Sequence, residues 1–392
     1  MARGRCGIRP RVVADDPPTG HLERYERGRH PRHPVPGWRR RAYNEPDSYL
    51  ATGAVSGRVA VSGPRRGRPP GARALDTRRR IAGAAPIPPE YPHAMPSMTD
   101  SAITRDGIRL LARHWPAGTP RAAVLLVHGL GEHCARYEHV GDQLAAAGLE
   151  TFGWDHRGFG ASGGERAWVD RWSRFHDDVE DRLAAVRAAL PGKPVILYGH
   201  SMGGLIVLGY AVSDRPPPDL LVLSAPGIDA DVPAWKRAIA PVAARVLPHL
   251  RIPNGIDPSA LSRDPARQEA VRTDPLMVTG STTGFGARFF EEQARVRAEA
   301  SKLSIPVLVI HGLDDPLVPA RVSESLGALP CVTRRTYPGI RHELHNEPEG
   351  PEILAEVIDW IDEQLAAAST SPSAAMGSAG SAAAAGSAAA TV

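Results

Sequence analysis

The chain has 392 residues, 42% of them hydrophobic, which allows one large domain or two ordinary ones with a sizeable core. No apolar run approaches the ~20 residues of a membrane-spanning helix. The net charge of +4 is unevenly distributed, because residues 1–98 hold 19 arginines, no lysine and 8 acidic residues, which leaves −7 for the rest. The part expected to fold is therefore acidic, which argues against nucleic acid as its partner.

The cysteines give no sign of a disulfide framework or a zinc site, because there are only three and they are widely spaced: Cys6, Cys134 and Cys331. The N-terminus also lacks the continuous apolar segment of a secretory signal. These features favour a reducing, cytoplasmic setting.

Residues 1–97 are rich in Arg, Pro and Gly and show no sustained period of 2 or 3.6. Such a segment cannot bury enough apolar surface to offset the entropy of ordering it, so we expect a disordered leader. Three interpretations stay open. The segment precedes the true start at Met95 or Met98, or it is an ordinary disordered tail, or it is an arginine-rich arm for targeting or nucleic-acid binding.

Structure is expected to begin near Ala102, with a hairpin over 103–110 that turns at Asp106-Gly107. Short apolar runs then alternate with helical patterns, which predicts an α/β fold with a mostly parallel sheet flanked by helices on both faces. We expect strands at 122–128, 149–154, 194–198, 220–223, 306–310 and 332–337, and helices at 137–147, 168–190, 205–210, 321–329 and 351–365.

Residues 227–300 interrupt this alternation with helix-like pieces separated by prolines, which we interpret as an inserted helical cap. Within it, 232–250 combines an apolar face with a basic one. The predicted organisation is a hydrolase core over 98–226 and 301–368, the cap between its two parts, and an Ala/Ser/Gly-rich flexible tail over 369–392.

The run Gly-His-Ser-Met-Gly-Gly at 199–204 stands between a predicted strand and a predicted helix. In that setting a sharp turn holds the serine in a strained conformation and projects its hydroxyl above the sheet. Strand and helix approach closely at such a turn, so Gly199 and Gly203 must lack side chains. Ser201 is therefore a candidate nucleophile.

Two further loops that follow predicted strands carry partners for such a serine. Residues 311–319 contain Asp314 and Asp315, and residues 338–347 contain His342 and His345. The carboxyl ends of parallel strands gather at one edge of the sheet, where ligands bind. A serine needs a histidine to take its proton and a buried carboxylate to orient that histidine, so the order Ser, Asp, His indicates nucleophilic catalysis.

The sequence resembles α/β-hydrolases of the monoacylglycerol lipase and lysophospholipase type, a serine aminopeptidase S33-like group of hydrolases. The resemblance covers about 103–365, and the leader and tail have no counterpart in it. It rests on His128-Gly129-Leu130-Gly131-Glu132-His133 with Arg136-Tyr137, Asp155-His156-Arg157-Gly158-Phe159-Gly160, the 199–204 run, the Asp315 loop and His342-Glu343.

The resemblance implies Ser201 as nucleophile, Asp315 as the orienting acid and His342 as the base. It also implies that the backbone N–H groups of Leu130 and Met202 form the oxyanion hole. No metal or organic cofactor is implied.

Neighbouring residues compete for these roles. The spacing from Gly312 and the following Val318 favour Asp315 over Asp314, which we expect to cap the helix beyond. His345 is expected within the turn that follows His342.

Other polar residues of the matched motifs have structural explanations. We expect His128 and His133 to hold the oxyanion loop in shape and Glu132 to be a buried hydrogen-bonding anchor. The loop 155–162, which looks ready for phosphate or metal, lacks dinucleotide-type glycine spacing and is interpreted as a structural turn. Trp168, Trp172 and Phe175 are expected to contact the core and the cap.

The function expected from these features is hydrolysis of the carboxylic esters of lipids, foremost monoacylglycerol to glycerol and fatty acid, through an acyl-serine. Lysophospholipase, thioesterase or general carboxylesterase activity remains an alternative, as does a non-catalytic ligand-binding protein of the same fold. An apolar and basic cap could also contact a membrane surface, which would make the protein peripheral to a membrane. The sequence gives no oligomeric state.

Overall fold

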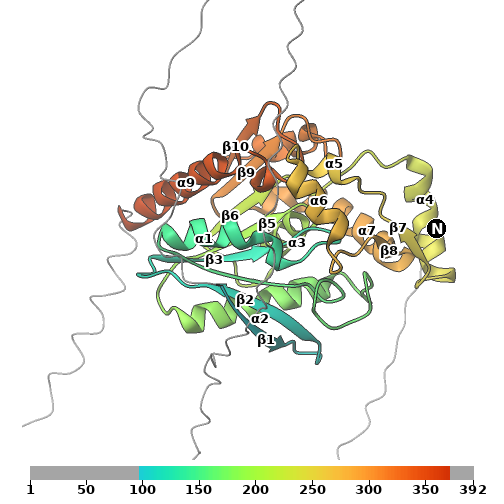
Figure 1. Cartoon of the computed structure of the whole chain (residues 1–392), viewed down its shortest axis with the longest axis horizontal. Helices are drawn as coiled ribbons and strands as arrows, with labels where there is room; N and C mark the ends of the chain where they lie inside the picture. The colour runs from blue at the N-terminus through green and yellow to red at the C-terminus, as the bar shows by residue number, and fades with distance from the viewer. Residues whose placement is uncertain (1–96, 371–392) are drawn as a thin grey trace, which may run out of the picture. The chain divides into compact units, whose positions relative to one another are not determined.

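A computed structural model describes residues 97–370. The leader over 1–96 and the end of the tail lie outside the described residues. Within 97–370, eight strands form a sheet in the order β1-β2-β4-β3-β5-β6-β9-β10 (Figure 1). The strands are β1 Met98–Ile103, β2 Arg109–Trp115, β3 Ala122–Val127, β4 Leu149–Trp154, β5 Val195–His200, β6 Leu220–Ser224, β9 Val307–Gly312 and β10 Val332–Tyr337.

The sheet is mostly parallel, as predicted. β2 pairs antiparallel with both β1 and β4, and every other neighbouring pair of the sheet runs parallel. The loops after β3, β5, β9 and β10 therefore leave the same edge of the sheet. These are the loops in which the sequence analysis located its candidate residues.

Both faces of the sheet are buried, which explains why its central strands are continuous apolar runs. In β3 the side chains of Val124 and Leu126 belong to one hydrophobic core, whereas Leu125 and Val127 belong to the other. This period of two is the geometry of a strand whose side chains alternate between faces. The two cores fix the sheet between its covering helices.

Helices cover the two faces in separate groups (Figure 1). Buried side chains of α1 and α9 pack into one core, and those of α2, α3 and α8 pack into the other. No helix within 97–370 is long and apolar enough to cross a lipid bilayer. The helices are α1 Glu138–Ala146, α2 Ser173–Ala189, α3 Met202–Ala211, α4 Ala234–Val246, α5 Pro258–Leu261, α6 Pro265–Thr273, α7 Thr283–Glu299, α8 Glu324–Gly327 and α9 Gly350–Thr370.

The predicted hairpin is present and begins earlier than expected. β1 starts at Met98 rather than near Ala102, and it pairs with β2 along its whole length. Gly107 in the turn has φ +84°, a conformation that glycine adopts without the strain of a side chain.

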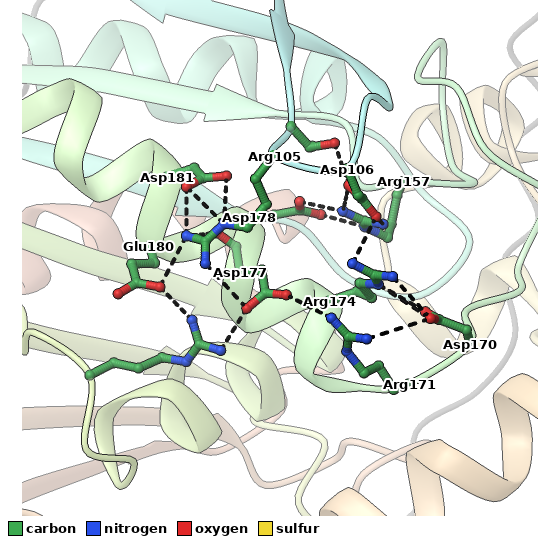
Figure 2. Close-up of polar contacts among 12 residues, drawn as sticks. Arg105, Asp106, Arg157, Asp170, Arg171, Arg174, Asp177, Asp178, Glu180 and Asp181 are labelled. Carbon is green, nitrogen blue, oxygen red and sulfur yellow. Dashed lines mark hydrogen bonds and ion pairs between the residues drawn. The ribbon is translucent and has the colours of Figure 1, made fainter. Parts of the chain in front are cut away.

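An ion-pair network joins this hairpin to α2 and to the loop after β4 (Figure 2). Arg157 of that loop donates to Asp178 at 2.7 Å and to Asp106 at 2.8 Å. Arg105 donates to Asp181 at 2.6 Å. The guanidinium of Arg157 is therefore already paired with carboxylates, in line with a structural role for the loop 155–162.

The expected helix over 168–190 is shorter, because α2 begins at Ser173. The residues before it are held by a different contact. The carbonyl of Ala167 accepts from the backbone N–H of Thr282 at 3.1 Å and from its hydroxyl at 2.9 Å. Ala167 itself has φ +47°, outside the helical region. Long-range pairing thus overrides the local helical pattern.

Two C-terminal expectations also need correction. The helix expected over 321–329 is a 3-10 turn over Ala320–Ser323 followed by the short α8. The last helix continues to Thr370 instead of ending at 365, because the alanines that follow favour helix. Residues 369 and 370, which were assigned to the flexible tail, are thus helical.

Residues 227–300, which we call the cap segment, separate β6 from β9 and contain α4 to α7. They also contain a two-stranded antiparallel sheet of β7 (Arg251–Pro253) and β8 (Gly280–Thr282). The sequence analysis did not predict this sheet, because strands of three residues are too short to show an alternating pattern. Trp172 and Phe175 of the core contact Phe285 of α7 edge-on or tilted, with ring centroids 5.7 and 6.2 Å apart. This aromatic cluster fastens α7 to the core, whereas α4 has no buried residue.

Candidate active site

Ser201 occupies the turn between β5 and α3 in a strained backbone conformation, with φ +52° and ψ −114°. Its N–H donates to the Ser224 carbonyl at 2.9 Å, which ties the turn to β6. A Cβ added to Gly203 would lie 2.0 Å from the Val127 carbonyl oxygen, and one added to Gly199 would lie 2.5 Å from the Gly203 oxygen. Only glycine permits this approach, as the sequence analysis expected.

The structure brings the three predicted side chains together from three loops at one edge of the sheet. His342 Nε2 lies 2.9 Å from Ser201 Oγ, and His342 Nδ1 lies 2.7 Å from Asp315 Oδ2. The other oxygen of Asp315 accepts backbone N–H bonds from Leu317 and Val318, each at 2.9 Å. The carboxylate is thereby fixed with Oδ2 facing the imidazole of His342, and His311 Nε2 lies 3.4 Å from the same oxygen.

The competing residues occupy other positions. Asp314 is exposed, and the 3-10 turn beyond it starts after Pro319 with no side-chain cap, so the expected capping role of Asp314 is wrong. His345 lies in the 3-10 turn Leu344–Asn346, as expected. Its ring stacks on Tyr137 with centroids 4.6 Å apart.

The electrostatics of the pair suit proton transfer. Burial lowers the pKa of His342, but the charge and hydrogen bond of Asp315 outweigh burial and raise that pKa above its ordinary value. Burial raises the pKa of Asp315, yet its interactions with His342 and His311 hold it well below the usual range. The carboxylate therefore stays ionised and stabilises a protonated His342.

The loop 128–133, which we call the oxyanion loop, runs beside Ser201. Within residues 97–370 the N–H groups of Leu130 and Met202 donate no hydrogen bond, whereas the Gly129 N–H donates to Glu132 at 2.5 Å. Free N–H groups beside a nucleophile can receive the negative charge of a tetrahedral intermediate. These are the two donors that the family resemblance implied.

Two buried histidines, His128 and His156, support this loop. Burial lowers the pKa of His128 well below its ordinary value, so its ring is neutral. Its Nδ1 lies 2.9 Å from the Gly129 carbonyl oxygen, and its Nε2 accepts the backbone N–H of His156 at 2.9 Å. His128 thus holds the loop instead of exchanging protons with substrate.

A buried ion cluster joins the oxyanion loop to the loop of His342. Glu132 accepts from Arg136 at 2.7 Å and from the Tyr137 hydroxyl at 2.8 Å. Burial raises the pKa of Glu132, and the nearby charge of Glu343 adds to that rise. Burial also disfavours the ionised form of Glu343, but Arg136 outweighs it and leaves the pKa of Glu343 lowered. Glu132 is thus the anchor that the sequence predicted.

A cavity of about 590 Å³ opens onto Ser201. Most of its lining residues belong to the cap segment, and most of its lining surface is apolar. That volume is within the range of small-molecule sites. Within residues 97–370 no cluster of three or more His, Cys, Asp or Glu side chains is arranged to hold a metal ion. The apolar cap residues of the lining include Ile256, Leu261, Val271, Met277, Val278 and Phe289.

The sequence analysis missed the cap residues that contact the oxyanion loop. His133 Nε2 lies 2.7 Å from Asp274 Oδ2, and the Val278 N–H donates to the Gly131 carbonyl at 2.7 Å. These contacts join residues some 140 positions apart, and no local pattern signals them. The Pro-interrupted composition of 227–300 indicated a cap without indicating where it touches the core.

The family model described as serine aminopeptidase, S33 matches residues 118–349. The monoacylglycerol lipase of Mycolicibacterium smegmatis is 35% identical over 266 residues, which cover 66% of this chain and 95% of that protein. The monoglyceride lipase of Homo sapiens is 34% identical over 279 residues, covering 68% and 91% of the two chains. A soluble variant of monoglyceride lipase from Saccharomyces cerevisiae, solved with a substrate analogue, superposes with a TM-score of 0.62 at 26% identity over 72% of this chain and 99% of that one.

Proposed function

This chain belongs to the serine aminopeptidase, S33 family, and we propose that within it the protein hydrolyses monoacylglycerols to glycerol and fatty acid. It is a serine ester hydrolase with the α/β-hydrolase fold, as the motifs predicted. The relatives named as monoacylglycerol or monoglyceride lipases support the substrate. The observation that carries the reaction is the 2.9 Å approach of His342 Nε2 to Ser201 Oγ.

In the proposed mechanism His342 takes the proton of Ser201 as the hydroxyl attacks the ester carbonyl. The Leu130 and Met202 N–H groups donate hydrogen bonds to the oxyanion of the tetrahedral intermediate and stabilise its negative charge. Removing one such donor typically costs about 3 kcal/mol of barrier. His342 then protonates the departing glycerol oxygen, which leaves an acyl-serine. Water, deprotonated by His342, attacks this ester by the same route, releases the fatty acid and restores Ser201.

The apolar cavity supports a long acyl chain over a small polar one. Each methylene that leaves water contributes about 0.8 kcal/mol, which is roughly fourfold in binding. The lining by Ile256, Met277 and Phe289 offers such burial next to Ser201. The glycerol group of a monoacylglycerol would then lie near Arg136 and Glu343, which are polar residues of the same lining.

We also propose that the cap segment binds the protein to the surface of a membrane. On α4 the apolar side chains of Trp235, Ile239 and Val242 are 61, 51 and 65% exposed. Lys236 and Arg245 lie on the same helix, and residues 232–256 contain no acidic side chain. Exposed apolar and basic side chains on one helix favour an interfacial position on anionic lipid. The cytoplasmic setting stays a prediction.

A panel of esters tests the proposal. We expect kcat/KM to rise about fourfold per methylene across monoacylglycerols of increasing length, until the cavity is filled. Ser201→Ala should abolish turnover and labelling by a fluorophosphonate, whereas Ser213→Ala, a change at a serine outside the site, should leave both intact.

The same panel can overturn the proposal in two ways. Preferential turnover of lysophospholipids, thioesters or short esters would assign another substrate class. Absence of both turnover and a Ser201 adduct would indicate a ligand-binding protein without catalysis.

A further inference from the structure

The cap segment reaches the oxyanion loop through its own backbone. The Val278 N–H donates to the carbonyl of Gly131 at 2.7 Å. Gly131 has φ +81°, and a Cβ at this position would lie 2.7 Å from the Val278 carbonyl oxygen. The two segments are therefore in direct backbone contact one residue after Leu130, and the contact requires glycine.

A second contact follows two residues later in the loop. His133 is 4% exposed, and its Nε2 lies 2.7 Å from Asp274 Oδ2. Its Nδ1 has no hydrogen-bond partner within residues 97–370, so Asp274 is the one partner that the described part of the chain gives this ring. The other oxygen of Asp274 accepts the Leu276 N–H at 2.8 Å. The carboxylate thus connects the imidazole to the start of the segment 274–279.

The oxyanion loop is consequently held from two sides. On the core side, Arg136 and Tyr137 hold Glu132, which accepts the Gly129 N–H within the loop. On the cap side, Val278 holds Gly131 and Asp274 holds His133. Leu130 lies between these two sets of contacts, and its N–H is a proposed donor to the oxyanion.

We propose that Asp274 is a positioning residue of the oxyanion hole, acting through His133 to keep the Leu130 N–H aimed at the reacting carbonyl. This inference rests on the proposed function. Displacing a catalytic group by about 1 Å can cost as much as 10²-fold in rate, so a cap contact that holds the loop contributes to turnover. Met277 and Val278 also line the cavity, so the segment that contacts the acyl chain is the one that holds the loop.

The chain offers a matched control at the other end of α6. Asp264 is the N-cap of this helix and accepts the Ala266 N–H at 2.8 Å, whereas Asp274 follows its last residue. Asp264→Ala therefore removes a carboxylate of the cap segment and the hydrogen bond that it accepts from the backbone, but it leaves the contacts of the oxyanion loop in place. Comparison with Asp274→Ala separates damage to the cap from loss of the loop contact.

The experiment measures kcat and KM of the full chain on p-nitrophenyl acetate, whose acyl group is too short to need the cap. We expect Asp274→Ala to lower kcat about tenfold with KM within about twofold, less than the 10²-fold or more of a deleted oxyanion donor. Asp264→Ala should keep kcat within about twofold of the unchanged chain. Asp274→Asn keeps one oxygen that can accept the His133 N–H, but its NH2 group cannot accept the Leu276 N–H, so this variant should recover part of the loss.

A double variant completes the test. If Asp274 acts through His133, then His133→Ala combined with Asp274→Ala should be no slower than His133→Ala alone. An unchanged kcat in Asp274→Ala, or losses that multiply in the double variant, would overturn the inference. If the unchanged chain hydrolyses no ester, the proposed function itself fails, and that outcome is separate from either of these.

Discussion

Arg136 donates to both carboxylate oxygens of Glu343, at 2.7 and 2.8 Å, and the same guanidinium donates to Glu132 at 2.7 Å. Glu132 belongs to the oxyanion loop, and Glu343 directly follows His342. A single buried cation therefore joins the loop that carries a proposed oxyanion donor to the loop that carries the proposed base. The cost of burying it is offset only while both carboxylates are in place.

Replacing Arg136 should therefore lower the stability of the folded protein. We expect Arg136→Met to destabilise the protein by about 3–5 kcal/mol, because it leaves two buried carboxylates without a counter-charge. The melting temperature should fall by about 6 °C or more. Arg321→Met, which breaks the exposed pair with Asp231, is the matched control and should leave the melting temperature unchanged. Equal behaviour of the two variants in thermal unfolding would contradict this account of the cluster.

The parts of the site that the sequence predicted are those with a local signature. A glycine-flanked serine after a buried strand predicted Ser201. The loop after the predicted strand 332–337 contains both His342 and His345, and the family resemblance selected His342. Their meeting at one sheet edge follows from the parallel topology alone.

The contacts that sequence could not predict depend on long-range packing. Asp274 of the cap segment contacts His133, and no periodic pattern in the sequence of the cap segment indicates this contact. Helix α2 begins later than predicted because Thr282 donates hydrogen bonds to the Ala167 carbonyl. In each case a tertiary hydrogen bond decided what local propensity left open.

The pH dependence of turnover should report the Asp315–His342 pair. The base must be neutral, so kcat/KM should fall as the pH drops through the pKa of His342 in the free enzyme. Because Asp315 raises that pKa, the midpoint of the acid limb should lie above the ~6.5 of an unperturbed histidine. A pH profile on p-nitrophenyl acetate measures it.

Two asparagine variants separate the adjacent carboxylates. Asp315→Asn removes the charge that raises the pKa of His342, so the acid limb should move to lower pH and kcat should fall roughly 10⁴-fold. Asp314→Asn, one residue away and exposed, should change neither. A shift caused by Asp314→Asn instead would exchange their roles.

The turn at Ser201 should not tolerate a methyl group. Gly203→Ala would place a Cβ 2.0 Å from the Val127 oxygen and 2.6 Å from the His128 oxygen, and both acceptors belong to backbone that cannot move independently. We expect a loss of about 3 kcal/mol, at the upper end of overpacking costs, together with lower kcat. At Gly118 an added Cβ would have no atom within 4 Å, so Gly118→Ala should leave the free energy of unfolding, measured by chemical denaturation, unchanged. Neutrality of both variants would mean that strand and helix are less closely packed there.

Membrane contact through α4 predicts that binding and chemistry can be separated. Trp235 and Val242 are 61 and 65% exposed and do not line the cavity, so replacing both with serine should leave turnover of p-nitrophenyl acetate unchanged. Sedimentation with phosphatidylcholine–phosphatidylglycerol vesicles should show binding weakened by about 3 kcal/mol, or roughly 100-fold, since two buried apolar side chains are lost. Ile103→Ser, 63% exposed on β1, serves as the control and should bind as the unchanged chain does. Raising the salt concentration should weaken binding of the unchanged chain, because Lys236 and Arg245 attract anionic lipid through a screened charge. Vesicle binding that survives the double serine replacement would move the membrane contact away from α4.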